Sequence, residues 1–203
     1  MGLSADEEQK IARCIRATEQ KTSAEIVCVL AHSSSEYAAL PILWSSVAAM
    51  LLPWILVGFT QLSVQRILLL QVVCFALLLA VLSWPTIRVR LAPPALRRAQ
   101  AHRAAMEQFM IRGLSRKKDR TGVLIFVSLA EHYVRIVADD GVAAKVKQRD
   151  WQDAVDAMLS HLRDNRPADG FVAAVERCGD LLAANFPPKP DGGGELSDRI
   201  YMI

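Results

Sequence analysis

Two long runs without a charged residue dominate the pattern of hydrophobic and polar positions along the chain. The first run covers residues 38–60 and the second covers residues 67–84. A helix needs about 20 apolar residues to cross the hydrocarbon core of a bilayer, so each run is long enough. We therefore predict a transmembrane helical hairpin over residues 38–87. The alternatives are a buried hairpin in a soluble protein and a signal sequence, but the charged segment 1–37 precedes the first run.

Arginines collect directly after the second apolar run. Arg88, Arg90, Arg97 and Arg98 form a basic flank, which we expect to face the membrane surface and its anionic headgroups. Lys and Arg are enriched on the cytoplasmic side of membrane proteins, and two crossings return the chain to the side that it left. The sequence therefore predicts a multi-pass protein of the inner (plasma) membrane with both termini in the cytoplasm. The lipid bilayer is its first expected partner.

Outside the hairpin, segments with helical spacing alternate with short apolar segments. A capping box of Ser4 and Glu7 opens the first helix. Residues 25–30 and 121–129 are nearly continuous apolar runs, as in strands that are covered on both faces. A short turn joins the second of these strands to residues 133–138, which predicts an antiparallel hairpin. The whole pattern predicts an α/β fold in which a small mixed sheet is flanked by helices, an α/β/α sandwich.

The remaining segments set the expected domain organisation. The last helix is expected to begin at Asp169, which would cap it. Residues 1–37 and 88–186 would form a single cytoplasmic α/β domain, into which the hairpin is inserted. Residues 187–203 are rich in Pro and Gly and are typical of a flexible tail. As an alternative, the last part of this tail, residues 199–203, would add to the sheet as an edge strand.

Composition narrows the function classes. The net charge is only +3, and no basic stripe with interleaved aromatic residues is present, so a nucleic-acid partner is not expected. The four cysteines are scattered and form no CxxC pair, which argues against a disulfide framework or a metal cluster and is typical of a reducing compartment. The four histidines have no metal-ligand spacing. Motifs of phosphate-binding loops, serine hydrolases and zinc proteases are absent.

One acidic turn is a candidate for chemistry. Asp139 and Asp140 follow the predicted strand 133–138 and precede a glycine. Carboxylates in such a turn can hold Ca²⁺ or Mg²⁺, and the bound cation can orient a phosphate ester for hydrolysis. The alternative is a turn and helix cap alone, with Arg120 as a surface partner of the carboxylates.

Further polar residues would extend this candidate site under one condition. If the strand 25–30 ran parallel to the strand 133–138, residues 33–36 would lie at the same edge of the sheet. Asp150 and Asp153 open a nearby predicted helix. No nucleophile with an adjacent base can be recognised in the sequence, so the turn offers a cation site before it offers a catalytic one.

Several segments resemble the TPM domain family, which includes plant thylakoid-lumen proteins and many bacterial membrane proteins. The segments are residues 22–27, 120–131, 134–139, 141–142, Trp151 and 195–199. The last of them resembles the ending of a bacterial subgroup with an inserted transmembrane hairpin. The resemblance implies an α/β sandwich fold. For some members, divalent-ion binding and a weak phosphatase activity are proposed, and most bacterial members have no settled role.

Two functions follow from these observations. The first is a membrane-anchored module that binds other membrane proteins or helps to assemble and maintain them. The alternative is a divalent-cation-dependent phosphatase at the membrane surface, with Ca²⁺ or Mg²⁺ held by Asp139 and Asp140. The acidic turn separates the two functions, because only the phosphatase requires it.

Overall fold

The chain forms two compact units. The computed structural model describes residues 3–34, 39–114, 120–188 and 200–203. Its packing separates an α/β unit, Met1–Ser34 with Arg98–Ile203, from a hairpin unit, Ser35–Arg97. We predict domain boundaries after residues 37 and 87, and these stay predictions. The division by packing falls after Ser34 and after Arg97.

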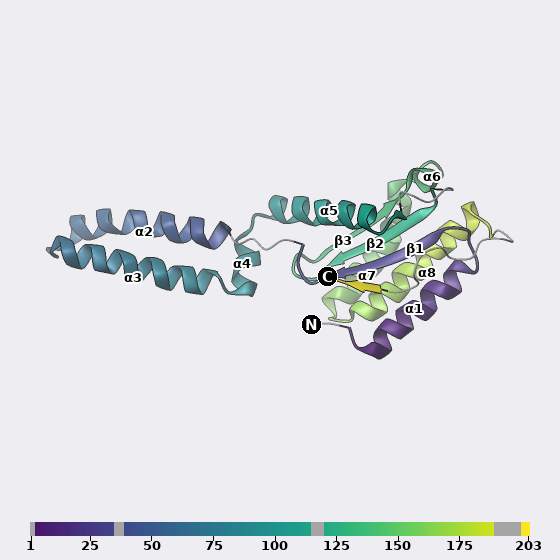
Figure 1. The fold of residues 1–203 in the computed structure, drawn as a ribbon, viewed down its shortest axis with the longest axis horizontal. Helices are drawn as coiled ribbons and strands as arrows, with labels where there is room; N and C mark the ends of the chain where they lie inside the picture. The colour runs from purple at the N-terminus through teal and green to yellow at the C-terminus, as the bar shows by residue number, and fades with distance from the viewer. Residues whose placement is uncertain (1–2, 35–38, 115–119, 189–199) are drawn as a thin grey trace. The chain divides into compact units, whose positions relative to one another are not determined.

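A four-stranded mixed sheet in the order β3-β2-β1-β4 forms the middle of the α/β unit (Figure 1). β1 (Glu25–Ala31) and β2 (Gly122–Ser128) are parallel, and β3 (Tyr133–Ala138) is antiparallel to β2. Every residue of β1 and β2 is buried, as the continuous apolar runs predict for strands that are covered on both faces. The predicted hairpin of β2 and β3 is confirmed.

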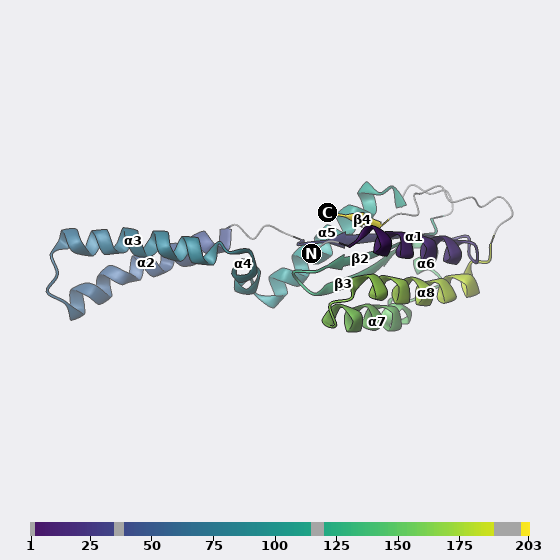
Figure 2. The same cartoon turned by 90° about the horizontal axis from the view of Figure 1, so that it is seen from below.

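Helices cover both faces of the sheet (Figure 2). One face carries three helices: α1 (Ala5–Glu19), α7 (Gln152–Arg163) and α8 (Pro167–Asn185). The other face carries α5 (Pro94–Ile111). The core between the sheet and the three helices contains, among others, Ile15, Trp151 and Phe171. The core between the sheet and α5 contains Phe109 and Phe126. The predicted α/β/α sandwich is therefore confirmed.

The helix ends follow local rules. In the capping box of α1, the Ser4 hydroxyl accepts from the Glu7 N–H at 3.3 Å, and the Glu7 carboxylate accepts from the Ser4 N–H at 2.8 Å. The prediction that Asp169 caps α8 is wrong: α8 begins at Pro167, because a proline suits the first turn of a helix. Asp169 lies in that turn and accepts from the Lys10 ammonium at 2.7 Å. Two short helices, α6 (Asp140–Ala143) and η2 (Gln148–Trp151), precede α7.

The end of the chain contributes a fourth strand. β4 (Ile200–Met202) pairs in parallel with β1, with Ile200 opposite Cys28. The prediction of a flexible tail up to residue 203 is therefore wrong for these last residues, and the alternative of an edge strand is confirmed. The physical reason is burial, because the Ile200 side chain joins the core under α1 and is only 8% exposed. The rest of the predicted tail, residues 189–199, lies outside the described residues.

The hairpin unit contains two long apolar helices and a short one. α2 (Ala39–Phe59) and α3 (Val64–Leu82) contact each other, and α4 (Pro85–Leu91) contacts both. By length and composition, α2 and α3 are each able to cross a membrane. The two predicted apolar helices are thus present, and their insertion into a bilayer stays a prediction.

Candidate functional site

The predicted acidic turn forms a helix cap. The backbone N–H of Asp139 donates to the Gly122 carbonyl at 2.9 Å and extends the ladder between β2 and β3 by one bond. The Asp139 carboxylate then accepts from the Asp140 N–H at 2.8 Å, as the cap of α6. The predicted turn and cap are therefore present, and they use only one oxygen of the carboxylate.

Asp140 points away from this cap. Its carboxylate accepts from the Arg120 guanidinium at 2.8 Å, which confirms the predicted proximity of Arg120 to the acidic turn. The two side chains are 60% and 82% exposed, so water screens the pair and its contribution to stability is small. Asp150 is also committed elsewhere, because its carboxylate accepts from the Lys147 N–H at 2.9 Å.

Asp139 is the buried acid of this turn. It is 6% exposed, and its second oxygen, Oδ2, has no hydrogen-bond partner among the described residues. Glu25, another buried carboxylate, lies in the same row of the sheet, with Gly122 between the two strands. Leu114 packs onto Gly122 so closely that a Cβ there would lie 2.7 Å from Leu114 Cδ2. Within the part of the chain that the structure describes, no three metal-ligating side chains converge.

The condition for a larger acidic site is not met. β1 runs parallel to β2, and β2 runs antiparallel to β3, so β1 is antiparallel to β3. Ser33 and Ser34 therefore lie at the end of the sheet opposite to Asp139, so these two residues do not extend the acidic turn. Residues 35 and 36 lie outside the described residues. The sheet has two chemically distinct ends.

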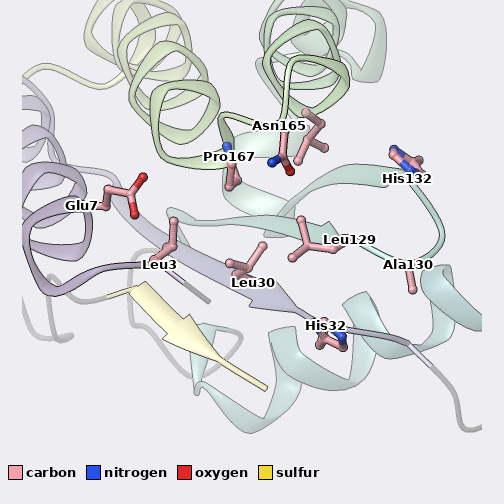
Figure 3. Close-up of a pocket in the computed structure, with 10 residues that line it drawn as sticks. Leu3, Glu7, Leu30, His32, Leu129, Ala130, His132, Asn165 and Pro167 are labelled. Atoms are coloured by element: carbon pink, nitrogen blue, oxygen red, sulfur yellow. The ribbon is translucent and has the colours of Figure 1, made fainter. Parts of the chain in front are cut away.

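The opposite end of the sheet carries a pocket that the sequence did not indicate. It has a volume of about 510 Å³ and lies at the carboxyl ends of β1 and β2, where ligands commonly bind in α/β folds (Figure 3). Its apolar wall comes from the segment before α1, from β1, from the turn directly after β2 and from α7: Leu3, Leu30, Leu129 and Leu162. Leucines from four separate elements leave no sequence pattern, so only the fold brings them together.

Polar side chains form the rim of this pocket. They are Glu7, His32, His132 and Asn165 (Figure 3). The two hydrogen bonds from Ser4 stabilise the charged form of Glu7 and lower its pKa below the usual value, so Glu7 is an anion at neutral pH and no general acid. His132 (φ 48°) and Asn165 (φ 58°) occupy left-handed turns that place the rim. An apolar wall with a polar rim suits recognition of an amphipathic partner.

A serine and glutamate cluster lies at the same end of the sheet. The Glu131 carboxylate accepts from the Ser33 hydroxyl at 3.2 Å and from the Ser34 N–H at 3.1 Å. It also accepts from the hydroxyl of Ser128, a fully buried residue at the end of β2. The Ser34 and Ser128 hydroxyls are 3.1 Å apart. This cluster fixes the segment that leaves β1 to the turn between β2 and β3, which sequence spacing alone does not show.

Three cysteines of the α/β unit are buried or half-buried thiols. Burial raises the pKa of Cys14, Cys28 and Cys178, the last to about 12. A thiol is nucleophilic only as its thiolate, so none of the three is activated at neutral pH.

The predicted basic flank spans the boundary between the units. Arg88 and Arg90 lie in the last turn of α4, where cations interact favourably with the helix dipole. Arg97 ends the hairpin unit and Arg98 begins the second segment of the α/β unit, both on α5. The Nε atoms of Arg88 and Arg97 are buried and have no hydrogen-bond partner in the described ranges. Whether these arginines face a membrane stays a prediction.

The fold of the α/β unit belongs to a known class of α/β domain. The family model of the TPM domain matches residues 88–181. The BA42 protein from the psychrophilic bacterium Bizionia argentinensis has a similar fold in its NMR structure, with a TM-score of 0.63 and 20% sequence identity over 100% of this chain and 97% of that chain. No curated protein matches the chain.

The match of the family model shows a TPM domain at residues 88–181, which confirms the resemblance of the sequence segments to this family. The two apolar helices are compatible with the hairpin insertion of the bacterial subgroup.

Proposed function

We propose that this protein is an integral protein of the inner membrane whose cytoplasmic TPM domain binds other membrane proteins or helps to assemble and maintain them. The observation that carries the proposal is the apolar surface of α2 and α3. Trp54, Phe59 and Val64 are 79%, 87% and 72% exposed in these helices or at their ends. Soluble proteins seldom expose so large an apolar surface, whereas lipid tails would cover it.

The arginines support the orientation. Arg88 and Arg90 follow α3 directly, and Arg97 and Arg98 lie a few residues further along the chain. Positive charge next to a transmembrane helix is retained on the cytoplasmic side. An even number of crossings then leaves the two segments of the α/β unit in the same compartment, as their common sheet requires.

The α/β unit supports a binding role. Its pocket combines an apolar wall with a polar rim, which is the composition of recognition sites. The chain runs from Ser34, beside this pocket, to the start of α2 at Ala39 within five residues. The sheet end with the pocket is therefore the end that the covalent chain connects to the hairpin unit, which favours partners that reside in the membrane.

Two measurements test insertion and orientation. After alkaline carbonate extraction, we expect the protein to stay in the membrane fraction, and its release would overturn the insertion of α2 and α3. A reporter fused after Ile203 should be active only in the cytoplasm, and periplasmic activity would overturn the orientation.

Partner binding is tested by purification in a mild detergent. Leu129→Arg places a charge on the pocket wall, and Ile111→Arg is the matched control on the exposed part of α5, where Ile111 is 62% exposed. We expect membrane proteins to co-purify with the wild type and the control but not with Leu129→Arg, with similar melting temperatures for all three. A partner-free wild type would count against the proposed function.

A divalent-cation-dependent phosphatase at the membrane surface is the second candidate function. It is favoured by the buried Oδ2 of Asp139, because a bound cation would supply the partner that this oxygen lacks among the described residues. Asp139 and Asp140 fit Ca²⁺ or Mg²⁺ as part of a site, and backbone carbonyls and water would have to complete the six to eight oxygen ligands of Ca²⁺. The cation would orient and polarise a phosphate ester.

Cation titration with thermal melting tests this second candidate. A cation that binds only the folded state raises the melting temperature, and we expect the rise to disappear in Asp139→Asn. Asp164→Asn, which loses only an exposed ion pair with Arg166, is the matched control for general charge effects. Unchanged hydrolysis of a model phosphate ester by Asp139→Asn would exclude a catalytic role for the turn.

A further inference from the structure

The outer edge of β1 is closed by two different means. The Ile26 N–H donates to the Glu19 carboxylate of α1 at 3.0 Å, so a side chain covers the first part of the edge. β4 covers the part from Cys28 to Leu30. Beyond the strand itself, the His32 N–H donates to the Ile203 carbonyl at 2.9 Å, and the Ile203 N–H donates to the Leu30 carbonyl at 3.0 Å. The edge therefore offers a short main-chain site between Cys28 and His32.

Two side chains of β4, Ile200 and Tyr201, pack against the two cores of the α/β unit. Ile200 enters the core, and the Tyr201 ring lies under the Arg112 guanidinium at 3.8 Å from the ring centroid. Met202 and Ile203 are 49% and 48% exposed. Recognition thus consists of main-chain hydrogen bonds, one buried aliphatic side chain and one aromatic side chain against a cation, which is how an added strand is usually selected.

The two described ends of the segment between α8 and β4 lie beside the same strand, β1. The Phe186 carbonyl accepts from the Thr22 hydroxyl at 2.7 Å and from the Ser23 N–H at 3.1 Å, beside the start of β1. Ile200 lies opposite Cys28, roughly 15 Å further along that strand at about 3.3 Å per residue. Residues 187–199 can extend to roughly 40 Å. β4 can therefore leave the edge while α8 keeps its anchor at Phe186.

We propose that the edge of β1 is a binding site for an extended peptide segment of a partner protein, and that β4 is the tethered occupant of this site. The partner segment adds in parallel beside Cys28 to His32. It places an aliphatic side chain at the position of Ile200 and an aromatic one under Arg112. The proposal rests on the proposed function, because it states the chemistry by which the partner is recognised.

The neighbouring pocket gives the partner an advantage over β4. Leu30 and His32 belong both to the edge of β1 and to the pocket lining (Figure 3). A tethered strand competes at an effective concentration in the millimolar range, so a partner needs contacts that β4 does not make. A segment longer than β4 obtains them, because it continues along the strand direction past His32 to the mouth of the pocket.

The test uses the full-length protein in detergent and a fluorescent synthetic peptide of residues 195–203. Ile200→Asp weakens the tethered strand, and we expect it to bind the peptide at least tenfold more tightly than the wild type does. A locked variant, His32→Cys with Met202→Cys joined by a short bismaleimide, holds β4 in place and should not bind. Circular dichroism and melting curves verify that each variant is folded, and Tyr201→Ala is the milder substitute for Ile200→Asp.

Each outcome decides the proposal. Tighter binding by Ile200→Asp, no binding by the locked variant and a loss of binding when the peptide tyrosine is replaced by alanine would support it. Equal binding by all variants would place the peptide elsewhere and overturn it. No binding by folded Ile200→Asp or Tyr201→Ala would make β4 a permanent strand and overturn it as well. In these last two cases, membrane proteins that still co-purify with the wild type would leave the proposed function standing on another surface.

Discussion

The close contact between α1 and α8 gives a quantitative test of the packing. A methyl group at Gly179 would overlap Thr18 Cγ2 and would lie 3.4 Å from Thr18 Cβ. Both positions are buried, so neither the Thr18 side chain nor the added methyl group at position 179 can turn into solvent. Gly179→Ala gains about 1 kcal/mol of helix propensity, whereas overpacking of a close contact costs about 1–3 kcal/mol. Because the overlap is severe, we expect a net loss of about 1–2 kcal/mol.

A second substitution isolates the contact. Thr18→Ser removes Cγ2 and costs about 0.8 kcal/mol by itself, as the loss of one buried carbon. In that background Gly179→Ala should become neutral or stabilising, because only the propensity gain is left. The assay is thermal melting by circular dichroism in detergent, where 1 kcal/mol corresponds to about 2–4 °C for a unit of this size. Additive effects of the two substitutions, or a stabilising Gly179→Ala alone, would refute the close approach of α1 and α8.

Three further predictions concern polar and thiol groups. The hydrogen bond from the Lys10 ammonium lowers the pKa of Asp169 below its unfolded value of 3.8. The charged Asp169 therefore stabilises the folded protein at pH values above 3.8, and this contribution is lost as the pH falls through the folded-state pKa. The difference in melting temperature between the wild type and Asp169→Asn should therefore vanish between about pH 5 and pH 2, and a pH-independent difference would contradict the ion pair. Glu131→Gln should lower the unfolding free energy in denaturant by about 1–3 kcal/mol, because the buried Ser128 hydroxyl loses a charged acceptor, and Glu131→Ala should cost no less. Burial raises the pKa of Cys178 to about 12, so maleimide at about pH 8 should label this thiol only after the protein unfolds. Mass spectrometry measures the labelling, and rapid labelling of the folded protein would argue against burial of Cys178.

The sequence predicts the elements of this fold better than their arrangement. Continuous apolar runs identify β1 and β2 because both strands are covered on two faces, and a short turn identifies β3 as the antiparallel neighbour of β2. The parallel pairing of β1 with β2 leaves no local signal, because the hairpin unit and α5 separate the two strands. Without that pairing, the relation of Ser33 and Ser34 to Asp139 cannot be derived. The sequence does not decide the place of β4 for a similar reason, since it depends on the burial of a single residue, Ile200.

The candidate sites differ in the same way. The acidic turn could be predicted because Asp139 and Asp140 are adjacent in sequence and follow a strand end, where capping is a local interaction. The pocket could not, because its wall consists of leucines from separate elements that look like ordinary core residues. The Glu131 cluster has a weak signal at most, a glutamate in a tight turn and two serines after a strand, and only the parallel register of β1 and β2 shows that they meet.

The place of β1 in the sheet has a mechanical consequence. β1 lies between β2 and β4, and its carboxyl end is the point from which the chain continues to α2. A force along the axis of β1 at this end would load the hydrogen bonds to both neighbouring strands in shear, so that the two strands share the load. The bonds from Ser33 and Ser34 to Glu131 are the first to bear it. The α/β unit is thus attached at a point suited to withstand tension along β1.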